Sequence, residues 1–153
     1  MTDLDRVTLH GRSIAFRRAD TPRGDRAILL VHGITNDASS WAPVVERLEG
    51  EHDVLAPDLP GHGASDRQRG DHSLGAHASV LRDLVEALHV DRVTVVGHSL
   101  GGGIAMQFAY QFPEHVERLV LVSSGGLGRE VSPLIRAAAL PFAEHALGLL
   151  GLP

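Results

Sequence analysis

The stretch VTVVGHSLGGGIAMQFA, residues 93–109, joins two kinds of local sequence at one serine. Its first four residues are mostly β-branched, which is typical of a buried strand, and the residues after Ser99 favour a helix. Gly97 and Gly101 stand two residues before and after Ser99, where the lack of a Cβ atom permits a sharp turn. This context predicts a strained strand-to-helix turn that raises the Ser99 hydroxyl above the sheet edge, as in a nucleophile elbow. The alternative is a glycine-rich connector in which Ser99 only caps the helix.

Composition and charge restrict the classes of protein to consider. The chain has 153 residues, of which 43% are hydrophobic and 22% charged, and this suits one soluble globular domain. The net charge of -5 gives no reason to expect nucleic acid or an anionic membrane as partner. Cysteine is absent, which excludes disulfides and thiolate zinc sites. The 14 basic residues are all arginine, which excludes a Walker phosphate loop and Schiff-base chemistry.

The chain carries no obvious targeting or membrane-spanning signal. Its first residues lack the basic start and the apolar core of a signal peptide. Its apolar runs are all shorter than the roughly 18 residues that a spanning helix needs. We therefore expect a cytoplasmic location and no membrane partner.

Local patterns predict alternating strands and helices. Expected strands cover residues 7–10, 13–16, 27–31, 53–57, 92–96 and 116–122, and expected helices cover residues 41–48, 74–88 and 100–111. The first two strands form a hairpin around Gly11 and Arg12. Ser39 or Ser40 is expected to cap the first helix, and Ser73 the second. The order predicts an α/β fold with a mostly parallel sheet.

Two further motifs follow predicted strands. The strand at residues 27–31 ends in His32-Gly33-Ile34. A backbone N–H just after this turn can point at the same carbonyl oxygen as the N–H of Leu100, and the pair would form an oxyanion hole. The segment DLPGHGAS, residues 58–65, follows the next strand.

Taken together, the three motifs resemble those of the α/β-hydrolase superfamily, and the resemblance runs from the hairpin to Gly128. It implies a sheet whose fifth strand carries the nucleophile, so that Ser99 matches the catalytic serine and Ile34 and Leu100 match the oxyanion donors. It gives the remaining motif residues elbow or structural roles: Gly97, His98, Gly101, His32 and Gly33. A serine nucleophile favours esterases, lactonases, C–C bond hydrolases, perhydrolases and acyltransferases over the dehalogenase and epoxide hydrolase branches, which use aspartate.

A complete triad is not evident in the sequence. In the family, the acid and the histidine follow the serine, normally after the seventh and eighth strands, whereas the segment 116–122 is the last strand that we expect here. His115 should lie at the opposite end of the sheet from Ser99, and His145 lies in an apolar helical segment. The acidic residues after Ser99 do not match the position of the triad acid: Glu114, Glu117, Glu130 and Glu144. We expect residues 1–128 to form the N-terminal part of a hydrolase core and residues 129–153 to begin its cap.

The ten histidines do not predict a metal site. None of their pairs has the H-E-x-x-H spacing, and His72 and His77, five residues apart, would not share a helical face. We expect neither a metal nor another cofactor.

Two function classes remain open. One is a serine hydrolase that acts on a small-molecule ester or related acyl substrate, with its base and acid supplied by residues absent from this chain. The other is a catalytically inactive truncated remnant, or one part of a split assembly. Loss of the general base costs about 10⁶ in rate, so the chain alone should be nearly inactive. An unpaired apolar strand at residues 116–122 would also promote self-association.

Overall fold

The computed structural model describes residues 4–18, 24–67 and 70–125. Within these residues the strands are β1 (Asp5–Leu9), β2 (Arg12–Arg18), β3 (Arg26–Val31), β4 (Val54–Pro57), β5 (Arg92–His98) and β6 (Val116–Val122). The α-helices are α1 (Ala42–Leu48), α2 (Leu74–Ala87) and α3 (Leu100–Gln111), and short 3-10 helices cover Ala38–Trp41 and Pro113–His115. The alternation expected from the sequence is confirmed in this part of the chain. The segment expected to begin a cap, residues 129–153, lies outside the described residues.

The strands form one mixed sheet in the order β1-β2-β4-β3-β5-β6. β1, β2 and β4 pair antiparallel, and β4, β3, β5 and β6 pair parallel. The expected hairpin is present, with its turn at His10 and Gly11 instead of Gly11 and Arg12. Both turn residues have positive φ, 50° and 77°, which is the signature of a type I′ turn.

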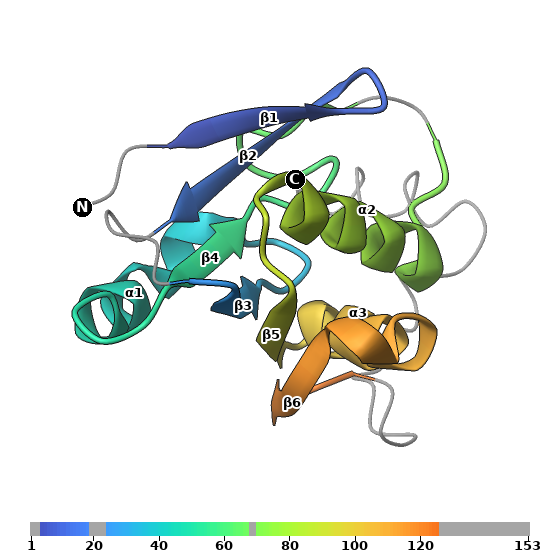
Figure 1. Cartoon of the computed structure of the whole chain (residues 1–153). Helices are drawn as coiled ribbons and strands as arrows, with labels where there is room; N and C mark the ends of the chain where they lie inside the picture. Colours follow the sequence, from blue (N-terminus) through green and yellow to red (C-terminus); the bar gives the residue numbers. More distant parts are fainter. Residues whose placement is uncertain (1–3, 19–23, 68–69, 126–153) are drawn as a thin grey trace.

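Helices cover the two faces of the sheet unequally (Figure 1). α2 and α3 lie on one face and bury an extensive core there, including Leu81, Leu84, Ile104 and Phe108. α1 lies on the other face, and its Val45 packs in a smaller core with Leu30, Val54 and Ala56. Trp41 packs at the border of this smaller core.

The expected cap of the first helix is wrong, and that of the second is right. Asp37 accepts a hydrogen bond from the backbone N–H of Ser39 at 2.8 Å and starts a 3-10 turn, so neither Ser39 nor Ser40 caps α1. The turn delays α1 until Ala42. Ser73 accepts a hydrogen bond from the N–H of Ala76 and caps α2.

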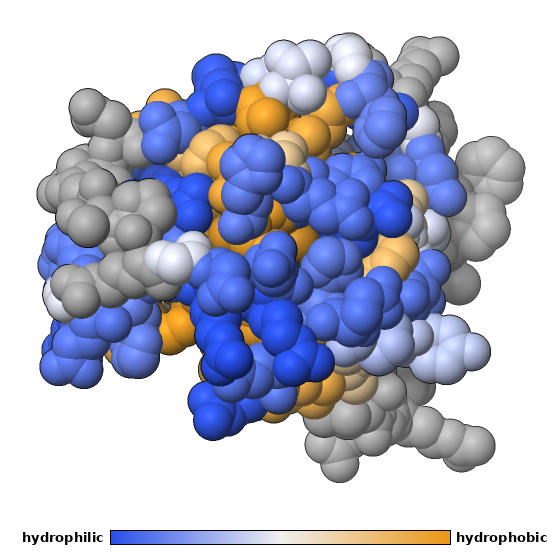
Figure 2. All heavy atoms as spheres, viewed as in Figure 1, coloured by the Kyte–Doolittle hydropathy of each residue, from blue (hydrophilic) through white to orange (hydrophobic). Residues whose placement is uncertain are grey.

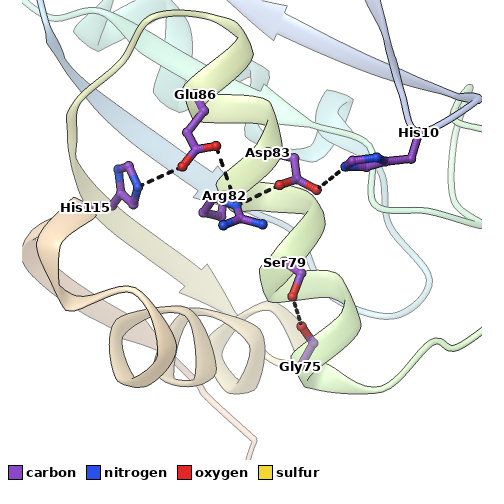
Figure 3. A network of polar contacts seen from close by, with 7 residues as sticks. All are labelled: His10, Gly75, Ser79, Arg82, Asp83, Glu86 and His115. Atoms are coloured by element: carbon purple, nitrogen blue, oxygen red, sulfur yellow. Dashed lines mark hydrogen bonds and ion pairs between the residues drawn. The ribbon is translucent and has the colours of Figure 1, made fainter.

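A chain of polar contacts along α2 places His115 in the fold (Figure 3). His10 meets Asp83 at 3.0 Å, Arg82 contacts both Asp83 and Glu86, and Glu86 reaches His115 at 3.4 Å. His115 comes directly before β6, whereas Ser99 follows the other end of the parallel strand β5. A seven-residue strand is about 23 Å long, so His115 and Ser99 lie at opposite ends of the sheet, as expected.

β6 forms one edge of the sheet within the described residues. Its Leu119, Val120 and Val122 side chains are 40%, 42% and 41% exposed. Figure 2 shows apolar side chains among polar ones in the lower part of the view, where β6 lies in Figure 1. The apolar edge expected from the sequence is therefore present in this part of the chain, and its self-association stays a prediction. None of the described helices has both the length and the apolarity needed to cross a bilayer.

Candidate active site

The backbone of Ser99 is strained at the junction of β5 and α3. Its φ of 53° and ψ of -116° form a combination that residues with a side chain rarely adopt. Hydrogen bonds hold it there: the N–H donates to Val122 O at 3.1 Å, and the carbonyl accepts from Gly102 N and Gly125 N, each at 3.0 Å. Ser99 is thus fixed both by its own helix and by the end of β6.

The two glycines around Ser99 are needed because backbone segments approach closely. A Cβ atom at Gly97 would lie 2.3 Å from the carbonyl oxygen of Gly101. A Cβ atom at Gly101 would lie 2.3 Å from the carbonyl oxygen of Val31, at the end of β3. Both distances are far inside van der Waals contact, so the sharp turn and its close packing against β3 require glycine at both positions.

The turn after β3 lies directly beside this elbow. A Cβ atom at Gly33 would be 3.1 Å from His98 Nδ1 and 3.3 Å from Ser99 Cβ. Ile34 follows Gly33 and is 55% exposed. Among the described residues, no acceptor is hydrogen-bonded to the backbone N–H of Ile34 or of Leu100. The fold therefore brings Ser99 together with the segments that carry these two N–H groups, which have no acceptor among the described residues.

His32 ties the turn after β3 to the DLPGHGAS segment. Its ring is fully buried, with Nδ1 2.8 Å from Gly33 O and Nε2 accepting the N–H of Leu59 at 3.0 Å. Because Nε2 accepts, the ring proton sits on Nδ1 and is donated to Gly33 O. Burial lowers the pKa of His32, which keeps the ring neutral. His32 has a structural role in this geometry and does not contact Ser99 through a hydrogen bond.

The DLPGHGAS segment is held by Asp58. This buried carboxylate accepts the N–H of Ala38 at 2.7 Å and that of Ala64 at 2.8 Å. Gly63, at φ 50°, packs so closely on the carboxylate that a Cβ atom would overlap it. The Ser65 hydroxyl donates to the carbonyl of Asp58 at 2.7 Å. These contacts give the segment a structural role.

The described residues do not complete a triad with Ser99. No side chain in residues 4–18, 24–67 and 70–125 forms a hydrogen bond with the Ser99 hydroxyl. Glu114 and Glu117 lie near His115 at the amino end of β6. Ser123, Ser124 and Gly125 follow its carboxyl end and offer no acid. The remaining candidates lie outside the described residues: Glu130, Glu144 and His145.

We also considered a cavity and possible metal ligands as candidate sites. A cavity of about 430 Å³ opens at the amino ends of β3 and β6 and is lined by charged residues that include Arg26, Asp53 and Glu117. Arg26 and Glu117 pair with each other there, and ligands of open α/β sheets bind at the opposite, carboxyl ends of the strands. Within the described part of the chain, no three His, Asp or Glu side chains are arranged to hold a metal ion.

Sequence reasoning missed two features around the site. The anchoring of the Ser99 backbone by Val122 and Gly125 involves main-chain atoms, which leave no signature in the sequence. His72 and His77 were expected not to share a helical face, and the sequence did not show that their ring centroids lie 5.7 Å apart. Helical spacing does not apply to this pair, because Ser73 caps α2 and His72 precedes the helix. The predicted cap was the signal that could have revealed it.

In this structure a strained serine connects a parallel strand to the start of a helix. This arrangement is typical of the α/β proteins with a strand–serine–helix elbow. The family follows from a match at the level of sequence. The chain belongs to the α/β-hydrolase fold family, whose sequence model matches residues 26–145.

The chain is similar to several longer proteins. An uncharacterized protein of Mycobacterium tuberculosis is 51% identical over 146 residues, which make up 95% of this chain and 42% of that protein. A 2-hydroxy-6-oxo-2,4-heptadienoate hydrolase of Pseudomonas putida is 36% identical over 134 residues, 85% of this chain and 48% of that hydrolase. The solved structure of Est816, an N-acyl homoserine lactone degrading enzyme, matches with a TM-score of 0.79 at 30% identity and covers 96% of this chain and 55% of its own. The chain thus spans about half of these relatives or less.

Proposed function

We propose that this chain carries the nucleophile and the oxyanion donors of a serine hydrolase that acts on an ester or a related acyl substrate. The observation that carries the proposal is the strained backbone of Ser99, with φ 53° and ψ -116°. Such strain costs about 1–3 kcal/mol and persists mainly where a functional site uses it. A serine that only capped the helix would need no such conformation.

The surroundings of Ser99 suit attack on a carbonyl group. Its hydroxyl would add to the carbonyl carbon, and the N–H groups of Ile34 and Leu100 would hold the oxygen that becomes negative. The positive end of the α3 dipole favours the same charge. The hydroxyl proton would pass to a histidine base oriented by an acid. Both would come from outside the described residues, because no described side chain hydrogen-bonds the Ser99 hydroxyl and His115 lies at the far end of the sheet.

The substrate class follows from the nucleophile and from the relatives. Attack by serine on a carbonyl gives an acyl-enzyme that water can hydrolyse. One relative is named as a hydrolase of an oxo-dienoate and another as an enzyme that degrades a lactone, and both compounds contain a carbonyl group. These names support a carbonyl substrate.

The alternative is a non-catalytic chain or one part of a split assembly. It is favoured by the fact that no described histidine or carboxylate contacts the Ser99 hydroxyl. Without a general base, the rate falls by about 10⁶, and the oxyanion hole with binding alone retains about 10³–10⁴ over water.

The decisive experiment compares Ser99→Ala with Ser79→Ala in an active protein that contains this chain. Ser79 is a matched control, because its hydroxyl only bonds Gly75 O within α2. We expect Ser99→Ala to abolish hydrolysis of a short-chain aryl ester, and Ser79→Ala to leave it unchanged. Both variants should keep the circular dichroism spectrum of the parent. Substantial turnover by Ser99→Ala would refute the assignment.

Labelling of the 153-residue chain by a fluorophosphonate distinguishes the two candidate functions. We expect weak or absent labelling, because no described base activates Ser99. Rapid stoichiometric labelling, lost in Ser99→Ala, would show that the chain supplies its own base and would exclude the non-catalytic alternative.

A further inference from the structure

Four histidine rings lie in two contacting pairs at the Gly61–Gly63 turn, and His62 belongs to the turn itself. The ring centroids of His32 and His62 are 5.2 Å apart, and those of His72 and His77 are 5.7 Å apart. The His72 ring also lies against the turn, with Cε1 3.5 Å from where a Cβ atom of Gly61 would be. The four rings therefore connect the end of β3, the turn and the start of α2.

His77 is buried without a polar partner for one ring nitrogen. Its exposed fraction is 4%, and its Nδ1 atom forms no hydrogen bond within the described residues. The titratable groups that face it are His72, His62, His32 and Asp71, so one carboxylate stands against three imidazoles. Burial, reinforced by the neighbouring imidazoles, lowers the pKa of His77 to about 4.

His32 cannot take up a proton without losing a hydrogen bond. Nδ1 donates to Gly33 O, and Nε2 accepts the N–H of Leu59. A proton on Nε2 would make this atom a donor that faces the donor N–H of Leu59, and the hydrogen bond between them would be lost. The charged groups that face His32 are His62, Asp58 and Asp37, and Asp58 already accepts two backbone N–H groups.

We propose that these four imidazoles form a proton-sensitive latch, which holds residues 59–65 between β3 and α2 while the rings are neutral and releases them when His32 and His77 are protonated. The latch is independent of the proposed hydrolase chemistry. The latch nevertheless contacts the elbow. The carbonyl of Gly33 accepts the hydrogen bond from His32 Nδ1, and Gly33 packs against Ser99.

The direction of the response follows from proton linkage. A histidine whose pKa is lower in the closed state than in the open state opposes opening above its ordinary pKa of about 6.5 and favours it below. With a closed-state pKa of about 4, His77 alone raises the opening equilibrium about 10- to 30-fold between pH 7.5 and pH 5.

Amide hydrogen exchange of the full chain tests the latch directly. The reporter is the N–H of Leu59, bound to His32, and the reference is the N–H of Val95 in the buried strand β5. After correction for intrinsic exchange rates, protection of Leu59 should fall about 10- to 30-fold from pH 7.5 to pH 5 and should stay below that of Val95 at both pH values, because Leu59 exchanges through a local opening. Equal protection of Leu59 at both pH values would overturn the proposal. So would equal protection of Leu59 and Val95 at pH 5, since both amides would then exchange only through global unfolding.

Two variants separate the latch from general acid sensitivity. His77→Phe keeps a ring of similar size and removes the buried titration, so it should reduce the pH-dependent change at Leu59 at least fivefold. His52→Gln removes an exposed histidine outside the array and should behave as the parent. If His77→Phe does not fold, the exchange of the parent chain still decides. An unchanged response in a folded His77→Phe would exclude His77 from the latch.

Discussion

Two glycines in the first turn of α3 should respond in opposite ways to the same substitution. Gly101→Ala and Gly103→Ala each add one methyl group to the helix, and each gains about 1 kcal/mol of helix propensity. The added Cβ atom meets very different surroundings at the two positions. At Gly103 the nearest atom is Leu74 Cδ1 at 3.4 Å, which is ordinary contact. We therefore expect Gly103→Ala to raise the free energy of unfolding by about 1 kcal/mol.

At Gly101 the new Cβ atom would lie 2.3 Å from Val31 O and 2.5 Å from His32 O. Relief of both overlaps requires α3 and β3 to separate by about 1 Å, because neither obstacle is a flexible side chain. Overpacking of this kind typically costs about 1–3 kcal/mol, and two backbone obstacles place it at the upper end. After subtraction of the propensity gain, we expect Gly101→Ala to lower the free energy of unfolding by about 2 kcal/mol.

Urea denaturation followed by the fluorescence of Trp41 measures both effects. With a slope of about 1.5 kcal/mol/M, the two variants should differ in midpoint by about 2 M, with the parent chain between them. Equal slopes would show that the compactness of the unfolded state is unchanged. A Gly101→Ala variant that unfolds at or above the parent midpoint would refute the close approach of α3 to β3, and with it the geometry of the elbow.

Other substitutions test contacts further from the elbow. Asp58→Ala leaves two backbone N–H groups unpaired, so it should lower the unfolding free energy by about 2–3 kcal/mol, measured by urea denaturation. Ser73→Ala removes the cap of α2 and should lower the unfolding free energy by about 1 kcal/mol, measured as a lower thermal midpoint. An unchanged midpoint would show that the cap does not contribute to stability. The unfolding free energy should be about 1–2 kcal/mol lower at pH 5 than at pH 7.5 through His77, whose folded pKa of about 4 lets the unfolded state bind more protons. His77→Phe should remove this contribution, while that of His32, whose pKa burial also lowers, remains. Val120→Lys should reduce self-association in sedimentation velocity at micromolar concentration, and a parent chain that sediments as a monomer would contradict self-association through β6.

Local sequence patterns predicted the parts of the fold that local physics decides. The β-branched run before Gly97, the helix formers after Ser99 and the cap at Ser73 each act within a few residues, and the structure contains all three elements. The cap before the first helix was harder to predict, because Asp37, Ser39 and Ser40 are all good capping residues. The choice among them depends on a 3-10 turn that begins one residue after Asp37.

Features that depend on contacts between distant segments could not be read from the sequence. The bond from Ser99 to Val122 depends on the register of β5 against β6, which includes an irregularity at Val93 and Thr94. The meeting of His32 with His62 depends on the path of the chain after β4. The motifs thus identified the residues of the candidate site, while the supports of those residues needed the fold.

The anchoring of Ser99 has a consequence for the order of events in folding. Val31 and His32, which lie against α3, come early in the sequence. Val122 and Gly125, which bind the Ser99 backbone, are synthesised last among the described residues. During synthesis from the N-terminus, strands β1 to β5 are therefore available before the residues that bind the Ser99 backbone. The strained serine therefore acquires its final conformation late, after the sheet from β1 to β5 can already be assembled. Partial detachment of β6 would relax the elbow while most of the sheet persists, so reactivity at this serine should be lost at lower denaturant concentrations than secondary structure.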